Sequence, residues 1–451
     1  MEAGFYRRVL LLALPVVLQN LITTSLGFMD TFMVGLLGSE EMSAVTVANT
    51  PVFIMQLLLF GLQSGSGVLI SQYWGKGDRA AISRVLGIAL YAALGVSLGF
   101  ALTAFCAPLP VLRLVTDNAR LIALATPYLR IVGVSYVFDA LASVYIGMQR
   151  STENPVFGMT VFIVSTLVNT LGNYILIFGK LGAPRLGVVG AATATLLARA
   201  LELVLCAAYL LRDRRLPPIP RCVLRPGGAM LRAFVRYGSP VLANETLWGL
   251  GTSMYTVIMG HMRISADILA AYTVAGSIDR VVMAAEIGLA AAAGVIVGKE
   301  VGMGERERAR AIGRTLSLAA LGLGVCVGAS EQLAYWGLLR PLLLPLFRLP
   351  ASAAGLCTAL VCCYSATAPL VSFAVVVVVG VLRAGGDVRV STLLDLVPLW
   401  CVTIPLLALA ALALDAPPLL VCVVMTTECV WKLPLCLARL RSGKWVHDVT
   451  N

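Results

Sequence analysis

An isolated carboxylate lies within the first apolar segment of the chain. Asp30 stands in the stretch GFMDTFMVG, and no Lys or Arg occurs within four residues of it. An ionisable side chain in a membrane span is costly, so its presence indicates a transport pathway or a binding partner. Because a partly dry cavity favours the neutral carboxyl group, Asp30 could exchange a proton near neutral pH, or it could hold sodium with nearby oxygens. A hydrated carboxylate without a role, near a helix end, is the alternative.

Two amides occur with helical spacing in a later apolar segment. Asn169 and Asn173 lie four residues apart in VSTLVNTLGNYILIF, which places both on one helix face. Thr195, in GAATATLLAR, could complete an oxygen-rich pocket with them. Hydrogen bonding between helices is an equally good explanation for these residues.

Further ionisable side chains lie in or beside other apolar segments. Glu245, in VLANETLWGLG, is the candidate functional carboxylate of the second half, with a solvated acid at a helix start as the alternative. Three pairs look like self-neutralising, structural ion pairs: Arg199 with Glu202, Asp279 with Arg280, and Glu428 with Lys432. No role is assigned to Asp139, Glu286 or Asp395.

Motifs of soluble enzymes are absent from the sequence. It contains no GxxxxGK[ST] and no HExxH, so neither an ATP motor nor a zinc peptidase site is encoded. The eleven cysteines form no CxxC pair, and we expect them to be small buried hydrophobes rather than metal ligands or disulfides. We therefore expect a protein that is not an enzyme and has no cofactor or metal, apart from a coupling proton or sodium ion.

The composition requires a bilayer as the main solvent. Of the 451 residues, 59% are hydrophobic and only 13% are charged, whereas soluble domains have about 25% charged residues. Apolar runs of about 20 residues span a membrane as helices, because their backbone polar groups must be satisfied internally. Twelve spans are predicted, near 9–34, 44–72, 84–108, 124–148, 156–178, 187–211, 235–260, 268–297, 311–335, 354–382, 390–413 and 417–438. The segments 110–122 and 336–350 are expected to be loop helices.

Basic residues indicate the orientation of the spans. With the N-terminus inside, 23 of the 34 Lys and Arg residues fall in cytoplasmic segments and 7 in outside segments. This bias predicts that both termini are cytoplasmic, and it explains the formal charge of +11 without nucleic acid. The segment 212–234 is rich in Arg, Pro and Gly and is expected to be a cytoplasmic linker. It would join an N-terminal six-helix lobe (1–211) to a C-terminal six-helix lobe with a short tail (235–451).

The two halves share a glycine pattern. GL-x4-GV-x6-G-x-G occurs at 61–77 and again at 288–304. With six spans in each half the copies have the same orientation, as in transporters whose two pseudo-symmetric bundles rock about a central site. We expect the glycines to allow close helix packing, and those in GKGD and GMGE to end a helix. The predicted fold class is therefore an all-α integral membrane protein of twelve transmembrane helices in two pseudo-symmetric six-helix bundles.

Six stretches, in order, resemble the multidrug and toxic compound extrusion (MATE) family of bacterial efflux transporters. They are MDTFMVGLLG, GSGVLISQYWGKGD, NTLGNYILIFGKLGAPRLGVVGAATAT, AGVIVGKEVGMGERERARAIG, GVLRAGGD and WCVTIPLL, and the tail RSGKWVHDVT is also similar. The resemblance implies an outward-facing V-shaped cleft and antiport of drugs with protons or sodium. It implies that Asp30 is the first-helix carboxylate of the family, that Asn169, Asn173 and Thr195 form the polar cluster beside it, and that Glu245 is a seventh-helix acid.

One position departs from the family pattern. Sodium-coupled relatives carry an Asp in the tenth helix, eight residues before the glycine that Gly380 matches, and this chain has Ser372 there. A cation site in the C-terminal lobe is therefore in doubt, and coupling through Asp30 gains weight.

The resulting hypothesis is a monomeric exporter of small cationic or amphipathic compounds in the inner membrane, driven by proton or sodium antiport. The nearest alternative is a flippase for lipid-linked saccharides, which would need an arginine-lined groove. The membrane arginines are only Arg130, Arg199 and Arg280, and two of them have acidic neighbours. An intramembrane enzyme would need clustered Asp, His or metal ligands, and a passive channel suits two homologous halves poorly.

Overall fold

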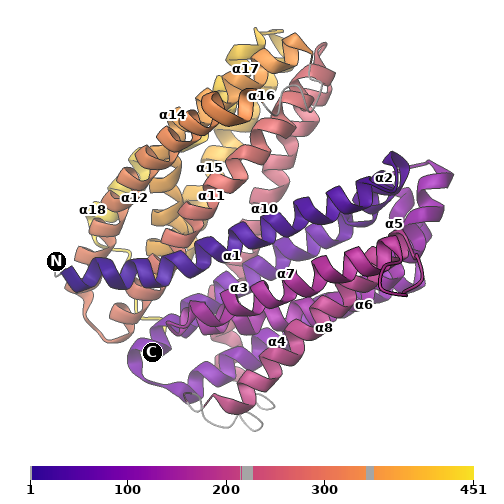
Figure 1. The fold of residues 1–451 in the computed structure, drawn as a ribbon. Helices are drawn as coiled ribbons and strands as arrows, with labels where there is room; N and C mark the ends of the chain where they lie inside the picture. Colours follow the sequence, from indigo (N-terminus) through magenta and orange to yellow (C-terminus); the bar gives the residue numbers. More distant parts are fainter. Residues whose placement is uncertain (1–2, 214, 216–226, 342–349, 451) are drawn as a thin grey trace. The chain divides into compact units, whose positions relative to one another are not determined.

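The computed structural model describes residues 3–213, 215, 227–341 and 350–450. These residues form long helices joined by short turns, and no strand occurs among them (Figure 1). Eleven helices of this part are long and apolar enough to cross a membrane. The all-α membrane class predicted from the sequence is therefore confirmed.

The helices follow one another closely along the chain. The first half contains α1 (Ala3–Gly35), α2 (Ser39–Ala48), α3 (Thr50–Lys76), α4 (Arg79–Cys106), α5 (Pro108–Arg113), α6 (Ala119–Ser151), α7 (Pro155–Phe178) and α8 (Val188–Arg212). The second half contains α10 (Gly228–Gly260), α11 (Ser265–Gly302), α12 (Arg306–Ala334), α14 (Ala351–Val375), α15 (Val388–Val397), α16 (Ile404–Ala408), α17 (Pro418–Met425) and α18 (Glu428–Ser442). π-Helical turns continue α12, α14, α15 and α16 at their C-terminal ends.

Helix α10 contains the seventh predicted span. Its 33 residues exceed the length that a bilayer requires. It is nevertheless not among the eleven helices that are both long and apolar enough to cross a membrane. Asn244 and Glu245 lie within it. Its range agrees with the predicted span 235–260, so the polar residues of that span belong to a helix rather than to a loop.

Both copies of the glycine repeat end in the same backbone conformation. Gly77 follows α3 with a φ of 76°, and Gly304 follows α11 with a φ of 84°. Glycine adopts this left-handed region without steric cost, so the prediction that these glycines end helices is confirmed. The side chain of Asp78 then accepts a hydrogen bond of 2.9 Å from Ala81 N and caps the first turn of α4.

The two predicted loop helices have different outcomes. In 110–122, α5 ends at Arg113 and a short connection leads to α6. In 336–350, the π-helical turn Tyr335–Leu339 extends α12, while positions 342–349 lie outside the described residues.

The chain folds as two compact units. Unit 1 comprises Met1–Val17 and Ala243–Asn451, and unit 2 comprises Leu18–Leu242. Helices α1 and α10 therefore each contribute to both units. These bounds differ from the predicted lobes 1–211 and 235–451, and the predicted linker 212–234 is partly helical because α10 begins at Gly228.

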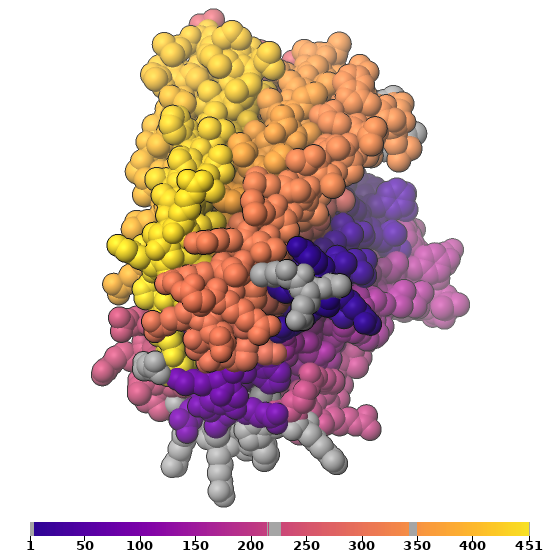
Figure 2. All heavy atoms as spheres, turned by 90° about the vertical axis from the view of Figure 1, so that its left-hand side faces the viewer, coloured from indigo at the N-terminus to yellow at the C-terminus, as the bar shows by residue number. Residues whose placement is uncertain are grey.

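The start of the chain belongs to unit 1 because its apolar side chains are part of that unit's core. Val9, Leu12 and Ala13 are buried in a cluster formed largely by α11, α12 and the π-helical segment Val376–Leu382 that continues α14. The C-terminal segment completes this cluster with Leu440 and Trp445. In Figure 2 this segment, in yellow, lies beside the orange helices of the same unit.

Unit 2 is organised around α6. This helix packs against α3, α4, α7 and α8, and it is the most deeply buried of the candidate spans. Helices α7 and α8 also pack against each other. Asn169, Asn173 and Thr195, which the sequence analysis singled out, therefore lie on helices that share one core.

Candidate functional site

Asp30 lies at the end of a chain of hydrogen bonds in unit 2. The amide Nδ2 of Asn173 donates to Asp30 Oδ1 at 2.6 Å and to Asn169 Oδ1 at 3.0 Å. Asn169 Nδ2 in turn donates to Thr195 Oγ1 at 3.3 Å. The structure thus brings together the four residues predicted for the first half, while their role in transport stays a prediction.

Small residues allow two of the three contributing helices, α7 and α8, to approach closely. Asp30 comes from α1, the two asparagines from α7 and Thr195 from α8. A Cβ atom on Gly190 would lie 2.6 Å from the backbone of Leu176, and one on Gly172 would lie 3.0 Å from the Cβ of Ala194. These close approaches between α7 and α8 bring the amide of Asn169 within reach of Thr195.

The site combines burial with unused hydrogen-bonding capacity. Asn169 and Asn173 are only 2% and 1% exposed, and Asn173 Oδ1 has no hydrogen-bond partner among the described residues. Asp30 forms no ion pair within that part of the chain, and the hydrogen bond from Asn173 is its contact with this site. A carboxylate can take up a proton, and carboxylate and amide oxygens are also the ligands that hard cations prefer. The residues present therefore fit either a proton or a sodium ion.

A second polar network in unit 2 surrounds Arg199. Its guanidinium forms ion pairs with Glu202 at 2.9 Å and with Asp139 at 3.1 Å. Glu202 also accepts a hydrogen bond from Ser165 at 2.5 Å, and Asp139 accepts one from Gln56. The predicted pairing of Arg199 with Glu202 is confirmed, and Asp139, for which the sequence assigned no role, is a second partner of the same arginine.

Glu245 in unit 1 is part of an ion-pair network. It lies 2.5 Å from Arg383 Nη1, and Arg383 is 1% exposed. A carboxylate 138 positions away along the chain thus holds the guanidinium of Arg383 inside the unit.

The same network continues through two further acids and a lysine. Asp395 accepts hydrogen bonds from Lys432 at 2.5 Å and from Asn244 at 2.8 Å. Lys432 also pairs with Glu428, as predicted. The network thus contains the carboxylates Glu245, Asp395 and Glu428 and the cations Arg383 and Lys432, one more acid than base.

A buried carboxylate, Glu286, contacts the position at which this chain departs from the family pattern. The sequence analysis assigned no role to it. Ser372 Oγ donates to Glu286 Oε1 at 2.8 Å, and the two residues are 0% and 1% exposed. Glu286 Oε2 has no hydrogen-bond partner among the described residues. A similar pair lies nearby along α14, where Ser365 Oγ donates to Glu331 Oε2 at 2.7 Å. The sequence analysis singled out both residues but did not link Glu286 to Ser372.

The proposed pairing of Asp279 with Arg280 is not an ion pair. Arg280 donates instead to Gly276 O at 3.2 Å and to Ser277 Oγ at 3.3 Å. Adjacent residues on a helix do not face one another, which explains why direct contact fails.

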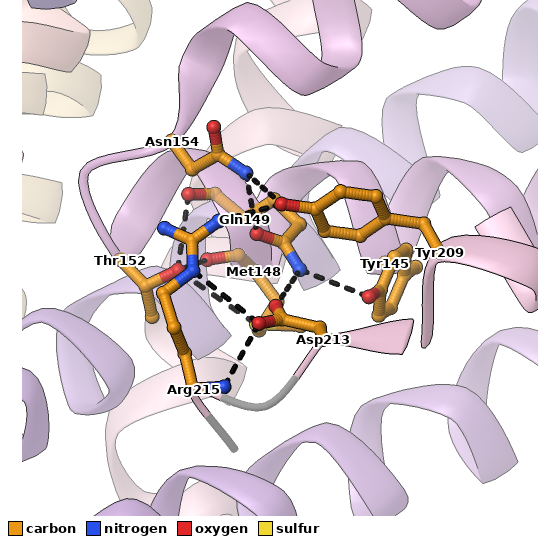
Figure 3. Close-up of polar contacts among 8 residues, drawn as sticks. All are labelled: Tyr145, Met148, Gln149, Thr152, Asn154, Tyr209, Asp213 and Arg215. Carbon is orange, nitrogen blue, oxygen red and sulfur yellow. Dashed lines mark hydrogen bonds and ion pairs between the residues drawn. The ribbon is translucent and has the colours of Figure 1, made fainter. Parts of the chain in front are cut away.

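A third network of unit 2 joins the ends of α6 and α8 (Figure 3). Gln149 Nε2 donates to Asp213 Oδ2 at 3.0 Å and to the Tyr145 hydroxyl at 2.9 Å. Arg215 donates through its backbone N and its Nε to Asp213 Oδ1, at 3.0 and 3.3 Å. Burial raises the pKa of Asp213, but the hydrogen bonds from Gln149 and Arg215 outweigh this effect and hold the pKa below its usual range. Sequence spacing gave no sign of this network.

Comparison with known proteins supports a single family. The family model MatE matches residues 15–175 and 240–409. A probable multidrug resistance protein NorM of Thermotoga maritima is 23% identical over 441 residues, which cover 96% of this chain and 92% of the relative. The multidrug resistance protein MdtK of Edwardsiella ictaluri is 26% identical over 327 residues, 71% of this chain and 70% of the relative.

Solved structures share the fold at low sequence identity. A Vibrio cholerae MATE transporter mutant superposes with a TM-score of 0.85 at 17% identity and covers 98% of both chains. An outward-facing multidrug resistance MATE family transporter of the MOP superfamily gives a TM-score of 0.84 at 20% identity, covering 97% of this chain and 96% of that one. The helices, the matched residues and these relatives agree, and the chain belongs to the MatE family, the multidrug and toxic compound extrusion transporters that its motifs resemble.

Proposed function

We propose that this protein exports small cationic or amphipathic compounds in exchange for a proton or a sodium ion that moves inward. The relatives named above as multidrug resistance proteins support the substrate class. The family consists of transporters, which agrees with the expectation that the chain is not an enzyme. The observation that carries the coupling is the hydrogen bond from the buried Asn173 to Asp30, a carboxylate with no ion-pair partner among the described residues.

The amide of Asn173 can respond to the charge of Asp30. An ionised carboxylate accepts from Nδ2, as observed, whereas a protonated carboxyl group would donate to the amide oxygen. Rotation of the amide to meet that donor would break its hydrogen bond to Asn169, and Asn169 contacts Thr195. The protonation state of Asp30 is thereby linked to three residues on two further helices.

The transport cycle that we propose alternates the access of one site between the two sides of the membrane. In the outward-open state Asp30 takes up a proton or sodium, which removes the charge that attracts a cationic substrate. The substrate leaves, the lobes rearrange, and the ion is released inside. Exchange is obligatory in this scheme because ion and substrate compete for the same charge.

Orientation, location and assembly belong to the same proposal. The excess of Lys and Arg in the segments assigned to the cytoplasm supports an inner-membrane protein with both termini inside. We propose a monomer that needs neither a cofactor nor a metal other than the coupling ion. A lipid flippase is less favoured, since Asp139 and Glu202 already neutralise Arg199.

Dye efflux from proteoliposomes tests the coupling. Wild-type protein is expected to extrude a cationic dye when a pH or sodium gradient is imposed, and the gradient that works identifies the ion. Asp30→Asn should abolish gradient-driven efflux. Asp117→Asn is the matched control, because this carboxylate is exposed in the turn before α6. Efflux by Asp30→Asn against a gradient at the wild-type rate would show that another group couples.

A further inference from the structure

A basic pocket lies beyond the helix ends of unit 1. It has a volume of about 530 Å³, and Arg306, Arg310, Lys444, His447 and Asp448 line it. Arg306 begins α12, and residues 444–448 follow the last residue of α18. The pocket therefore lies at the end of the helices, apart from the carboxylate sites described above.

The C-terminal segment that forms one wall is firmly held. Trp445 is fully buried, and its indole lies so close to Gly313 and Gly385 that a Cβ atom at either position would be within 3.0 Å of it. His447 N donates to Gly385 O at 2.7 Å. Lys444 and His447 on either side of Trp445 are thus held at the wall of the pocket.

The opposite wall contacts the same segment. Arg310 Nε donates to Gly443 O at 3.2 Å, and Gly443 has a φ of 63° that ends α18. Since Arg310 and Gly443 lie 133 positions apart, the pocket is a product of the tertiary fold rather than of a run of basic residues.

Positive charge exceeds negative charge within the pocket. Arg310 is neutralised in part by Glu307 at 2.5 Å, and Asp448 Oδ1 accepts from Thr450 N and Oγ1 at 2.8 and 2.5 Å. Neither Arg306 nor Lys444 has an ion-pair partner in the part of the chain that the structure describes. Cations that line one pocket attract an anion, and the amino end of the 29-residue helix α12 adds positive potential.

We propose that this pocket binds a phosphate-bearing anion through Arg306, Arg310 and Lys444. Guanidinium groups match the geometry of phosphate oxygens, and lysine supplies a compact charge. With both termini cytoplasmic, as proposed above, the pocket faces the inner leaflet, where anionic lipids concentrate. The head group of an anionic phospholipid and a soluble phosphate share this chemistry, and the two sources are separated by experiment.

The test measures thermal unfolding of the purified full chain in two settings. In detergent, inorganic phosphate is titrated to about 10 mM at constant ionic strength. In nanodiscs, phosphatidylglycerol is compared with phosphatidylcholine alone. The pocket variant is Arg306→Gln with Lys444→Gln. The control of equal charge is Arg314→Gln with Arg441→Gln, because both residues are exposed at the same end of unit 1 and neither lines the pocket.

A soluble anion would be identified if phosphate stabilises the wild type and the control in a saturable way. Its affinity for the pocket variant should then be at least about tenfold weaker. Stabilisation by phosphatidylglycerol alone, lost only in the pocket variant, would identify a lipid head group. Equal responses of pocket variant and control, or no response of wild type in either setting, would overturn the proposal. If the double variant unfolds before measurement, Lys444→Gln against Arg441→Gln gives the same comparison.

Discussion

The hydroxyl of Ser372 on α14 donates a 2.8 Å hydrogen bond to the fully buried carboxyl group of Glu286 on α11. The resemblance to sodium-coupled relatives would place an aspartate at position 372, so its absence argued against a cation site in the second half. The structure places a carboxylate in contact with that position, contributed by a different helix. Unit 1 therefore holds an acid beside this position, and α11 rather than α14 supplies it.

Ser372→Asp should create a pair of carboxyl groups around one position. Two acids at hydrogen-bonding distance cannot both ionise unless a cation lies between them. We expect sodium to raise the unfolding temperature of Ser372→Asp by more than that of the wild type, in thermal unfolding at constant ionic strength. Ser372→Asn has the same size without the charge and should respond as the wild type does. An equal sodium response of all three proteins would show that the two side chains do not share a cation.

Asn173→Leu should impair coupled efflux more than Asn169→Leu. Asn173 donates to a carboxylate at 2.6 Å, whereas Asn169 donates to a hydroxyl at 3.3 Å. A hydrogen bond to a charged group is worth about 1.5–3 kcal/mol, so loss of the first corresponds to a decrease of about tenfold or more in efflux rate. Dye efflux from proteoliposomes at matched protein amounts measures the order. A greater loss in Asn169→Leu would contradict the proposed path from Asp30.

Spacing along the sequence predicted contacts within one helix but could not predict contacts between helices. Asn169 and Asn173 lie four residues apart, so helical geometry alone placed them on one face of α7. The contact of Asn173 with Asp30 spans 143 positions, and only the family resemblance linked the two. The pairs Glu245–Arg383 and Glu286–Ser372 depend on which helices pack together, and apolar periodicity carries little information about helix pairing in a bilayer.

Arg383→Gln should destabilise the protein strongly because it leaves Glu245 buried without its partner. Loss of one member of a buried ion pair costs about 3–5 kcal/mol, and Arg383 and Glu245 are 1% and 10% exposed at their side chains. Chemical denaturation in detergent measures the loss. The double variant Glu245→Gln with Arg383→Gln should recover part of it.

The exposed pair of Arg263 and Asp415 is the natural control for this prediction. Its side chains are 87% and 59% exposed at a separation of 3.2 Å. Arg263→Gln should cost about 0–1 kcal/mol, because water and salt screen surface ion pairs. Similar losses for Arg383→Gln and Arg263→Gln would mean that the buried network contributes little.

Protonation of Asp213 should make unit 2 less stable in acid. Its pKa is lowered in the folded protein, since the hydrogen bonds from Gln149 and Arg215 outweigh the effect of burial. A depressed pKa stabilises the fold above the unfolded value of 3.8, and this contribution is lost as the pH falls through the folded pKa. Asp213→Asn cannot titrate, so the difference in unfolding temperature between wild type and variant should be largest near neutral pH and shrink below about pH 4.

Gln149→Leu removes a donor to Asp213 and should reduce the acid-dependent part of the wild-type stability without eliminating it, because Arg215 still donates. A difference between wild type and Asp213→Asn that stays constant from neutral pH to pH 3 would show that this network does not depend on the charge of Asp213.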